Sequence, residues 1–133
     1  MAKILVADVA ATNARLVRVL EGRHEMHFAT TMEEALSTLK ERAFDLIICG
    51  MDFDESQMIE LLRTVKGIEE LANTRFICLR VGIPAAEEEQ VLKLARFMGA
   101  CKYIALETIE SRADADLLGE IEACLPREII RSR

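Results

Sequence analysis

The sequence lacks any long apolar run and any block of basic residues. Its first apolar run, residues 4–7, ends at Asp8 and is too short for a signal peptide or a membrane span. Export is therefore not expected, and the cytoplasm is the expected location. Lys and Arg form no stripe, and the net charge is -6. These features argue against direct binding of nucleic acid or of an anionic membrane.

Clustered cysteines and metal-ligand motifs are also missing. The cysteines are widely spaced, with no C-x-x-C pair: Cys49, Cys78, Cys101 and Cys124. We expect free thiols that pack as small hydrophobic residues in a reducing compartment. His24 and His27 would point to opposite faces of an extended segment, so we expect solvated histidines on an edge strand and no metal site.

The common catalytic motifs of α/β proteins are absent as well. No strand is followed by G-x-G-x-x-G, and neither G-x-x-x-x-G-K-[ST] nor G-x-S-x-G occurs. A dinucleotide site, a Walker phosphate loop and a hydrolase nucleophile elbow are therefore unsupported. A haloacid-dehalogenase-like phosphatase would need a second Asp at position 10, where this chain has Ala10.

What the chain does have is a regular alternation of short apolar runs and helical spacing. The runs predict strands over residues 4–7, 24–29, 46–49, 76–79 and 103–106. Helical stripes follow them at residues 16–20, 35–39, 58–65, 91–95 and 117–125. Thr31 with Glu34 forms a capping-box pattern, Pro84 suits the first turn of the fourth helix, and Gly99 ends that helix.

Five such units in 133 residues predict one α/β domain over residues 1–125. Its fold is a three-layer α/β/α sandwich, flavodoxin-like, with the parallel sheet order 2-1-3-4-5. Residues 126–133 read as a short tail or the stump of a linker. In this topology Asp8 and Gly50 end the two strands that flank the crevice where ligands bind.

The segments KILVADVAATNARLVRVLEG, FDLIICGMDFDESQMIELLRTVK, FICLR and GACKYIAL resemble the receiver domains of bacterial two-component response regulators. The resemblance runs from Lys3 to about Leu125. In that family two adjacent acids and a phosphorylated Asp hold magnesium, while a Ser or Thr and a Lys contact the phosphoryl group.

Carried over position by position, most of this chemistry is missing. Asp8 matches the first acid, but Val9 replaces the second, and Gly50 replaces the phosphoacceptor Asp. Arg80 stands at the Ser/Thr position and Leu106 at the Lys position. Glycine cannot form an aspartyl phosphate, so the resemblance implies a degenerate receiver, or pseudo-receiver, without enzymatic activity or a cofactor.

The function that we expect is a phosphorylation-independent signalling module of a two-component or phosphorelay pathway, acting through a protein partner or as a homodimer. The resemblance implies a partner face on the fourth helix, fifth strand and fifth helix. Tyr103 stands at the family's switch aromatic, and Lys93, Arg96 and Lys102 could supply the rest of that face. Without phosphorylation, one orientation of the Tyr103 ring is expected to dominate.

Two alternatives stay open. Asp52 or Asp54 could accept phosphate in place of Gly50, with magnesium on Asp8; against this, Asp54 or Ser56 can simply cap the helix that follows. A small-molecule effector could instead bind between the loops at residues 9–13 and 80–84.

Arg80 is the most informative substitution at the degenerate site. We predict that its guanidinium pairs with Asp8 and fills the place of metal and phosphate. Otherwise Arg80 would simply extend into solvent near the end of its strand.

Overall fold

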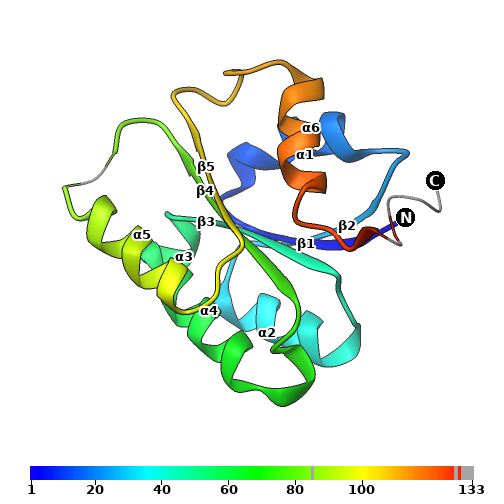
Figure 1. Cartoon of the computed structure of the whole chain (residues 1–133), viewed down its shortest axis with the longest axis vertical. Helices are drawn as coiled ribbons and strands as arrows, with labels where there is room; N and C mark the ends of the chain where they lie inside the picture. The colour runs from blue at the N-terminus through cyan, green and yellow to red at the C-terminus, as the bar shows by residue number, and fades with distance from the viewer. Residues whose placement is uncertain (85, 128, 130–133) are drawn as a thin grey trace.

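The computed structural model describes residues 1–84, 86–127 and 129. In this part of the chain, five parallel strands form one sheet with the order β2-β1-β3-β4-β5 (Figure 1). The strands are β1 (Lys3–Ala7), β2 (Glu25–Ala29), β3 (Leu46–Gly50), β4 (Arg75–Val81) and β5 (Lys102–Leu106). The predicted fold class and strand order are confirmed.

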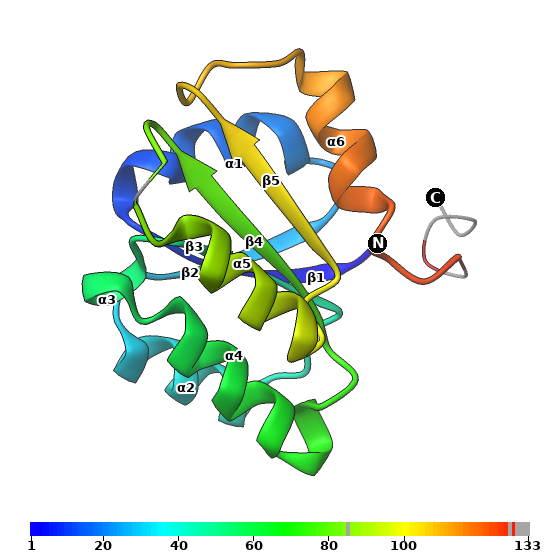
Figure 2. The ribbon, with the colours of Figure 1, turned by 60° about the vertical axis from the view of Figure 1, so that its left-hand side comes forward.

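Helices cover both faces of this sheet. They are α1 (Asn13–Leu20), α2 (Met32–Glu41), α3 (Phe53–Ser56), α4 (Met58–Gly67), α5 (Glu88–Phe97) and α6 (Asp114–Glu122), with single 3-10 turns η1 (Ala10–Thr12) and η2 (Glu69–Leu71). Figure 2 shows α1 and α6 on one face and α2, α4 and α5 on the other. A hydrophobic core lies on each side of the sheet, which makes three layers.

The burial of each strand follows its sequence pattern. All residues of β3 are buried, as expected for a continuous apolar run in the middle of a parallel sheet. In β2, at the sheet edge, only Ala29 is buried. The alternating pattern therefore placed this strand correctly at the edge.

One predicted helix start is confirmed and another is wrong. The Thr31 hydroxyl accepts a hydrogen bond from the Glu34 N–H at 3.1 Å, and α2 begins at the next residue, Met32. Pro84 does not lie in the first turn of a helix, because α5 begins only at Glu88. A left-handed Gly82, with φ +101, turns the chain as it leaves β4 and precedes a longer connection.

The prediction of two solvated histidines is half wrong. His24 is buried: its Nδ1 accepts from the Ala2 N–H at 3.0 Å, and its Nε2 lies 2.8 Å from a carboxylate oxygen of Glu122. The left-handed Gly22, with φ +79, turns the chain just before this residue. His27 is only half-buried and lies beside Glu25.

The acidic segment after β3 does not cap the helix that follows it. Asp54, Glu55 and Ser56 all have positive φ values, and α4 starts after Gln57 without a side-chain cap. The Asp54 carboxylate instead accepts a hydrogen bond of 2.7 Å from the N–H of Met32. It therefore caps α2, a neighbouring helix, and the predicted capping of α4 is wrong.

Three of the cysteines are buried as small hydrophobic residues, as expected, but Cys101 is exposed. The predicted tail lies partly outside the described residues, at positions 128 and 130–133. Within the part that is described, no helix is long and apolar enough to cross a membrane.

Candidate functional site

The candidate site lies at the carboxyl ends of β1 and β3. These strands pair in parallel with Ala7 opposite Cys49, so the next residues along each strand, Asp8 and Gly50, come side by side. The sequence predicted this pair because both residues end strands that flank the switch point of the sheet.

The Asp8 carboxylate is enclosed by the protein. Only 4% of the residue is exposed, and burial raises its pKa to about 6. Hydrogen bonds from the Val9 N–H, at 2.7 Å, and from the Thr12 hydroxyl partly oppose this rise, while the nearby charge of Asp52 adds to it. Because desolvation disfavours the charged form, this acid is partly protonated near neutral pH.

Gly50 leaves the space into which this carboxylate fits. A Cβ built on Gly50 would overlap both carboxylate oxygens and the Cγ of Asp8. The Asp8 carboxylate in this position therefore excludes any side chain at position 50, because it occupies the place where that side chain would begin.

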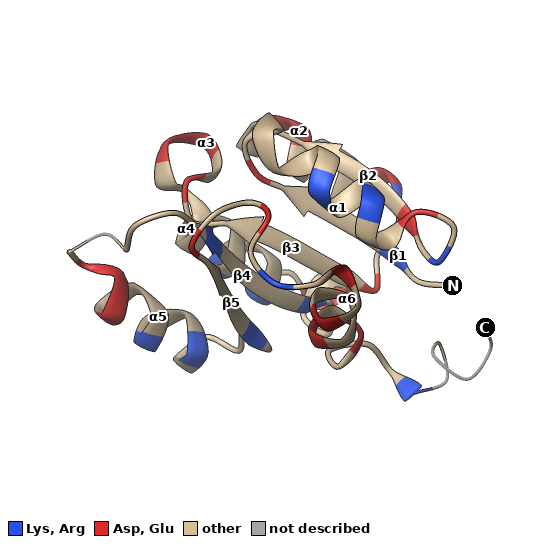
Figure 3. Ribbon diagram, turned by 90° about the horizontal axis from the view of Figure 1, so that it is seen from above, with Lys and Arg blue, Asp and Glu red and all other residues tan. Residues whose placement is uncertain are grey.

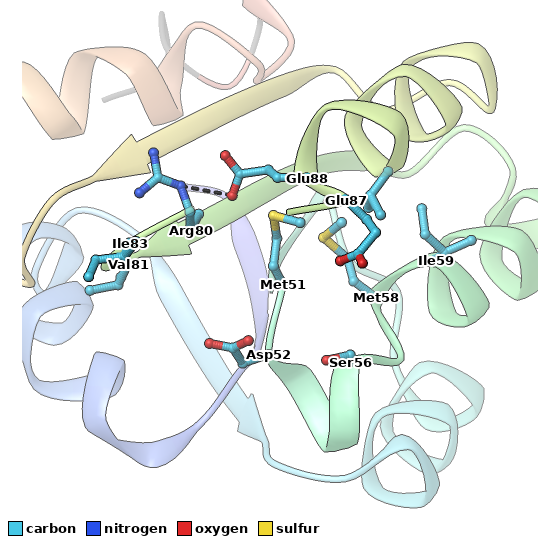
Figure 4. Close-up of a pocket in the computed structure, with 11 residues that line it drawn as sticks. Met51, Asp52, Ser56, Met58, Ile59, Arg80, Val81, Ile83, Glu87 and Glu88 are labelled. Carbon is cyan, nitrogen blue, oxygen red and sulfur yellow. Dashed lines mark ion pairs between the residues drawn. The ribbon is translucent and has the colours of Figure 1, made fainter. Parts of the chain in front are cut away.

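The predicted pairing of Arg80 with Asp8 is wrong. The Arg80 Nε lies 2.9 Å from the Oε1 of Glu88 and donates to the Tyr103 hydroxyl at 2.9 Å. The guanidinium also donates to the carbonyl of Gly82. Figure 4 shows the Nε of Arg80 joined to Glu88 by this ion pair, with the guanidinium well apart from Asp52. Nor does Arg80 extend into solvent, since its side chain is only 14% exposed.

Tyr103 belongs to the same group of contacts. Its hydroxyl donates to the Oε2 of Glu88 at 2.8 Å while it accepts from Arg80. Burial raises the pKa of this phenol, so the hydroxyl keeps its proton and can donate. We call Arg80, Glu88 and Tyr103 the triad. Its contacts connect β4, α5 and β5, and they hold the tyrosine ring in one orientation.

The other predicted pocket residues are divided between two small hollows. Val9 and Asp52 line one hollow of about 220 Å³ together with Asp8. Asp52 also lines a neighbouring hollow of about 210 Å³ with Arg80 (Figure 4). Leu106 lines neither of them; it is buried in the core beneath α1 and α6.

The donor set around Asp8 does not fit a magnesium site. Val9 offers no side-chain oxygen, the carboxylate of Asp54 is held by α2, and Asp8 is almost fully covered. Among the described residues, no group of three or more His, Cys, Asp or Glu side chains could hold a metal ion. Magnesium needs near-octahedral coordination by oxygen atoms and usually keeps several waters, which a nearly covered carboxylate does not accommodate.

The predicted partner face corresponds to α5, β5 and α6. Lys93 and Arg96 are exposed on α5, and Lys102 lies 3.8 Å from Glu120 of α6. Figure 3 shows basic residues along α5 after an acidic first turn. Beside them Phe97 is 90% exposed and Leu94 41% exposed, so the face combines basic and apolar groups.

The sequence reading missed several residues that shape the site. No role at the site was predicted from the sequence for Glu88 or for Thr12. Arg15, on α1, is buried and donates to the carbonyls of Ile109, Ser111 and Arg112 in the loop after β5. The contacts of Arg15 join segments more than 90 residues apart, so no local pattern could indicate them.

Comparison with known proteins finds this architecture but no close relative. The sequence matches no protein-family model and no curated protein. A CheY-like receiver domain protein from Methanospirillum hungatei JF-1 superposes with a TM-score of 0.76 and 21% identity, over 100% of this chain and 99% of that one. The fold is that of a receiver domain.

Two further structures agree. The receiver domain of a signal transduction histidine kinase from Syntrophus aciditrophicus gives a TM-score of 0.75 and 21% identity, over 94% of this chain and 90% of that one. An orphan response regulator from H. pylori gives a TM-score of 0.73 and 19% identity, over 94% and 97%. At such identities the likeness establishes the fold, and function has to be argued from the site.

Proposed function

We propose that this chain is a cytoplasmic, non-enzymatic signalling module of a two-component or phosphorelay pathway, which works by protein–protein contact and without accepting a phosphoryl group. The receiver fold supports the pathway. The single observation that carries the rest is that the Asp8 carboxylate fills the position of a side chain at Gly50, where the acceptor of a receiver would be.

The surrounding residues support the loss of phosphotransfer. A phosphoryl group carries negative charge, and a receiver neutralises this charge with a metal ion and a lysine. Here the corresponding positions hold Val9, which is 42% exposed, and the buried Leu106. The cation at the remaining position, Arg80, is already paired with Glu88.

The triad supports a fixed signalling state. In a receiver the switch aromatic changes position with phosphorylation, whereas the Tyr103 hydroxyl here has a donor and an acceptor within 2.9 Å. Both partners lie in elements that border the partner face. We infer that the face formed by α5, β5 and α6 keeps one conformation without phosphorylation.

The partner that fits this face is a protein with an acidic rim and an apolar centre, or a second copy of the chain. Lys93 and Arg96 are exposed beside Phe97, and large exposed aromatic residues often form the centre of an interface. A homodimer is tested by sedimentation of the wild type and of Phe97→Asp across a concentration series. Glu41→Lys, at an exposed position at the end of α2 and outside the partner face, is the matched control.

An amide NMR titration tests the loss of phosphotransfer. The protein receives Mg²⁺ and then beryllofluoride, a phosphoryl mimic, with a phosphorylatable receiver as the positive control in the same buffer. We expect no clustered shift changes. Changes centred on Asp8, Gly50 and Asp52 that spread to Tyr103 would show a working site and overturn the proposal.

The alternative acceptor makes a separate prediction. Asp52 is exposed and lines the hollow of Asp8, so it is the better placed of the two candidate acids. Incubation with acetyl phosphate would add the mass of one phosphoryl group, and Asp52→Asn would abolish that gain. An unchanged mass in the wild type supports the proposal made here.

The small-molecule alternative has less support from the site. Neither hollow, at about 210 and 220 Å³, reaches the roughly 300–1,000 Å³ of ordinary ligand pockets. A rise in melting temperature with a small metabolite would be the result that favours it.

A further inference from the structure

Two cysteines come together at the edge of the sheet away from the candidate site. Cys101 immediately precedes β5, and its N–H donates to the Phe76 carbonyl at 2.7 Å. Cys124 lies in the turn after α6, where its N–H donates to the carbonyl of Ile121 at 3.1 Å. The Cys101 side chain is near enough to raise the pKa of the Cys124 thiol.

The packing of α6 on β5 accounts for this encounter. The helix runs back along the strand in the opposite direction (Figure 2), and the ion pair of Lys102 with Glu120 connects them at 3.8 Å. Cys101 lies one residue before Lys102, and Cys124 lies about one helical turn after Glu120. Both cysteines therefore lie just beyond the same ion pair, at the same end of the interface.

The two thiols differ in solvent exposure, so they would react at different steps. Cys101 is exposed and can meet an oxidant in solution, whereas Cys124 is 3% exposed and lies in the core beneath α6. The other two cysteines, Cys49 and Cys78, are buried in the core on the opposite face of the sheet. An accessible thiol beside a second thiol is the arrangement of redox-sensing cysteines.

We propose that Cys101 and Cys124 form a reversible disulfide when the protein meets a peroxide. The bond would link the start of β5 to the end of α6 and so fasten two elements of the partner face. This modification rests on the positions of the two thiols alone and does not depend on the proposed function.

The chemistry proceeds in two steps. The Cys101 thiolate attacks one oxygen of hydrogen peroxide; the S–O bond forms, the O–O bond breaks, and the departing hydroxide takes a proton to leave as water. The sulfur of Cys124, having given up its proton, then attacks the sulfenic sulfur; the S–S bond forms, the S–O bond breaks, and a second water leaves. Two thiols lose two electrons in total, and peroxide is reduced to two waters.

The second step needs the Cys124 thiol in its ionised form. Burial, and then the neighbouring Cys101 side chain, raise the pKa of this thiol to about 12, and Lys102 and Arg75 oppose the rise by a smaller amount. Only a small fraction of this thiol is ionised at neutral pH, and the thiolate is the attacking form. We therefore expect the second step to be faster at higher pH, and a thiol reductant to reverse the disulfide.

The experiment measures maleimide labelling and disulfide linkage of the cysteines in the folded chain of 133 residues. Reduced protein is treated with hydrogen peroxide and then denatured in the presence of N-ethylmaleimide, which labels every free thiol. The mass of the intact protein is then measured. We expect the four maleimide labels of the reduced chain, one for each cysteine, to fall by two, with full recovery after dithiothreitol. Peptide mapping of the wild-type chain without reduction should find the peptides of Cys101 and Cys124 joined by a disulfide.

Variants separate this pair from the other cysteines. Cys101→Ser, at an exposed position, should keep the fold and prevent the loss of two labels. The double variant Cys49→Ser/Cys78→Ser should keep the Cys101–Cys124 link. A disulfide between two chains through Cys101, a link of Cys49 to Cys78, or Cys101 ending as a sulfinic acid without any link would each overturn the proposal.

Discussion

The carboxylate of Asp8 occupies the position that the Cβ of any residue other than glycine would take at position 50. In a receiver, the corresponding acid and the acceptor aspartate stand side by side and share a metal. Here the Asp8 carboxylate fills the space beside Gly50, and burial raises its pKa to about 6. The absence of a side chain at position 50 leaves room for this carboxylate.

Gly50→Ala is expected to destabilise the protein by about 1–3 kcal/mol, because the added methyl group displaces the Asp8 carboxylate from a packed site. In an Asp8→Ala background the same change should cost much less, since the clashing atoms are gone. Urea unfolding of the two single variants and the double variant measures this coupling.

Gly119→Ala is the matched control for that cycle. Gly119 is an exposed residue within α6, and a Cβ there meets nothing within 4 Å. This variant should gain about 0.5–1 kcal/mol from helix propensity. Equal costs of Gly50→Ala with and without the Asp8 carboxylate would contradict the overlap.

Asp8→Asn is expected to stabilise the protein at neutral pH. The pKa of Asp8 is raised from 3.8 to about 6, so the folded state binds more protons than the unfolded state between these values. Stability that is present below about pH 4 is therefore lost as the pH rises through 6. Two pKa units correspond to up to about 3 kcal/mol at pH 7, and asparagine avoids this loss.

The measurement is urea unfolding of wild type and variant between pH 4 and pH 8. The difference should be small at pH 4, grow up to about pH 7 and stay level from there to pH 8. Asp52→Asn, at an exposed position of the same hollow, should show no comparable pH dependence. A difference between wild type and Asp8→Asn that stays constant across the range would mean that the buried charge is not its cause.

The fold could be predicted from the sequence because its signals are local. A short continuous apolar run such as residues 46–49 favours a strand covered on both faces, and Thr31 with Glu34 marks a helix start within four residues. Connection rules for parallel sheets then leave few topologies. The same rules placed Asp8 beside Gly50, since both simply end paired strands.

The partners of the side chains could not be predicted, because they depend on distant segments. The pairing of Arg80 was decided by where α5 begins, and Pro84 suggested an earlier start than Glu88. With the true start, Glu88 rather than Asp8 lies beside the guanidinium. Asp54 likewise binds a helix that precedes it by a whole strand, which no capping pattern within its own segment can indicate.

Asp54→Ala is expected to cost about 1 kcal/mol by removing the cap from α2. The carboxylate accepts from the Met32 N–H at 2.7 Å, one of the donors that a helix start leaves unpaired. Asp54→Asn should cost less, because asparagine keeps an accepting oxygen and tolerates the left-handed φ of 43. Hydrogen exchange at the Met32 amide reports the loss directly.

Glu55→Ala is the control for this prediction. Glu55 is the neighbouring left-handed residue, with φ 59, and is exposed, so its truncation should leave exchange at Met32 unchanged. Equal effects of Asp54→Ala and Glu55→Ala would mean that the whole turn, and not the carboxylate, orders the start of α2.

Glu88→Ala should be the most disruptive change in the triad, because it leaves the Arg80 guanidinium without its carboxylate in a largely covered site. Removing one partner of a buried ion pair costs about 3–5 kcal/mol. Tyr103→Phe, which removes one hydroxyl, should cost about 1 kcal/mol. Truncation of Lys93, whose ion pair with Glu89 is exposed, should cost less than either.

Tyrosine fluorescence gives a second measurement of the same contact. The chain has one tyrosine and no tryptophan, so the signal comes from Tyr103 alone. Glu88→Ala should raise the quenching of this signal by acrylamide, because the ring loses the acceptor that holds its hydroxyl toward α5. Since the ring borders the partner face, the same variant should also weaken any complex formed there. A ring that is quenched equally in wild type and variant would show that packing, and not the triad, fixes its orientation.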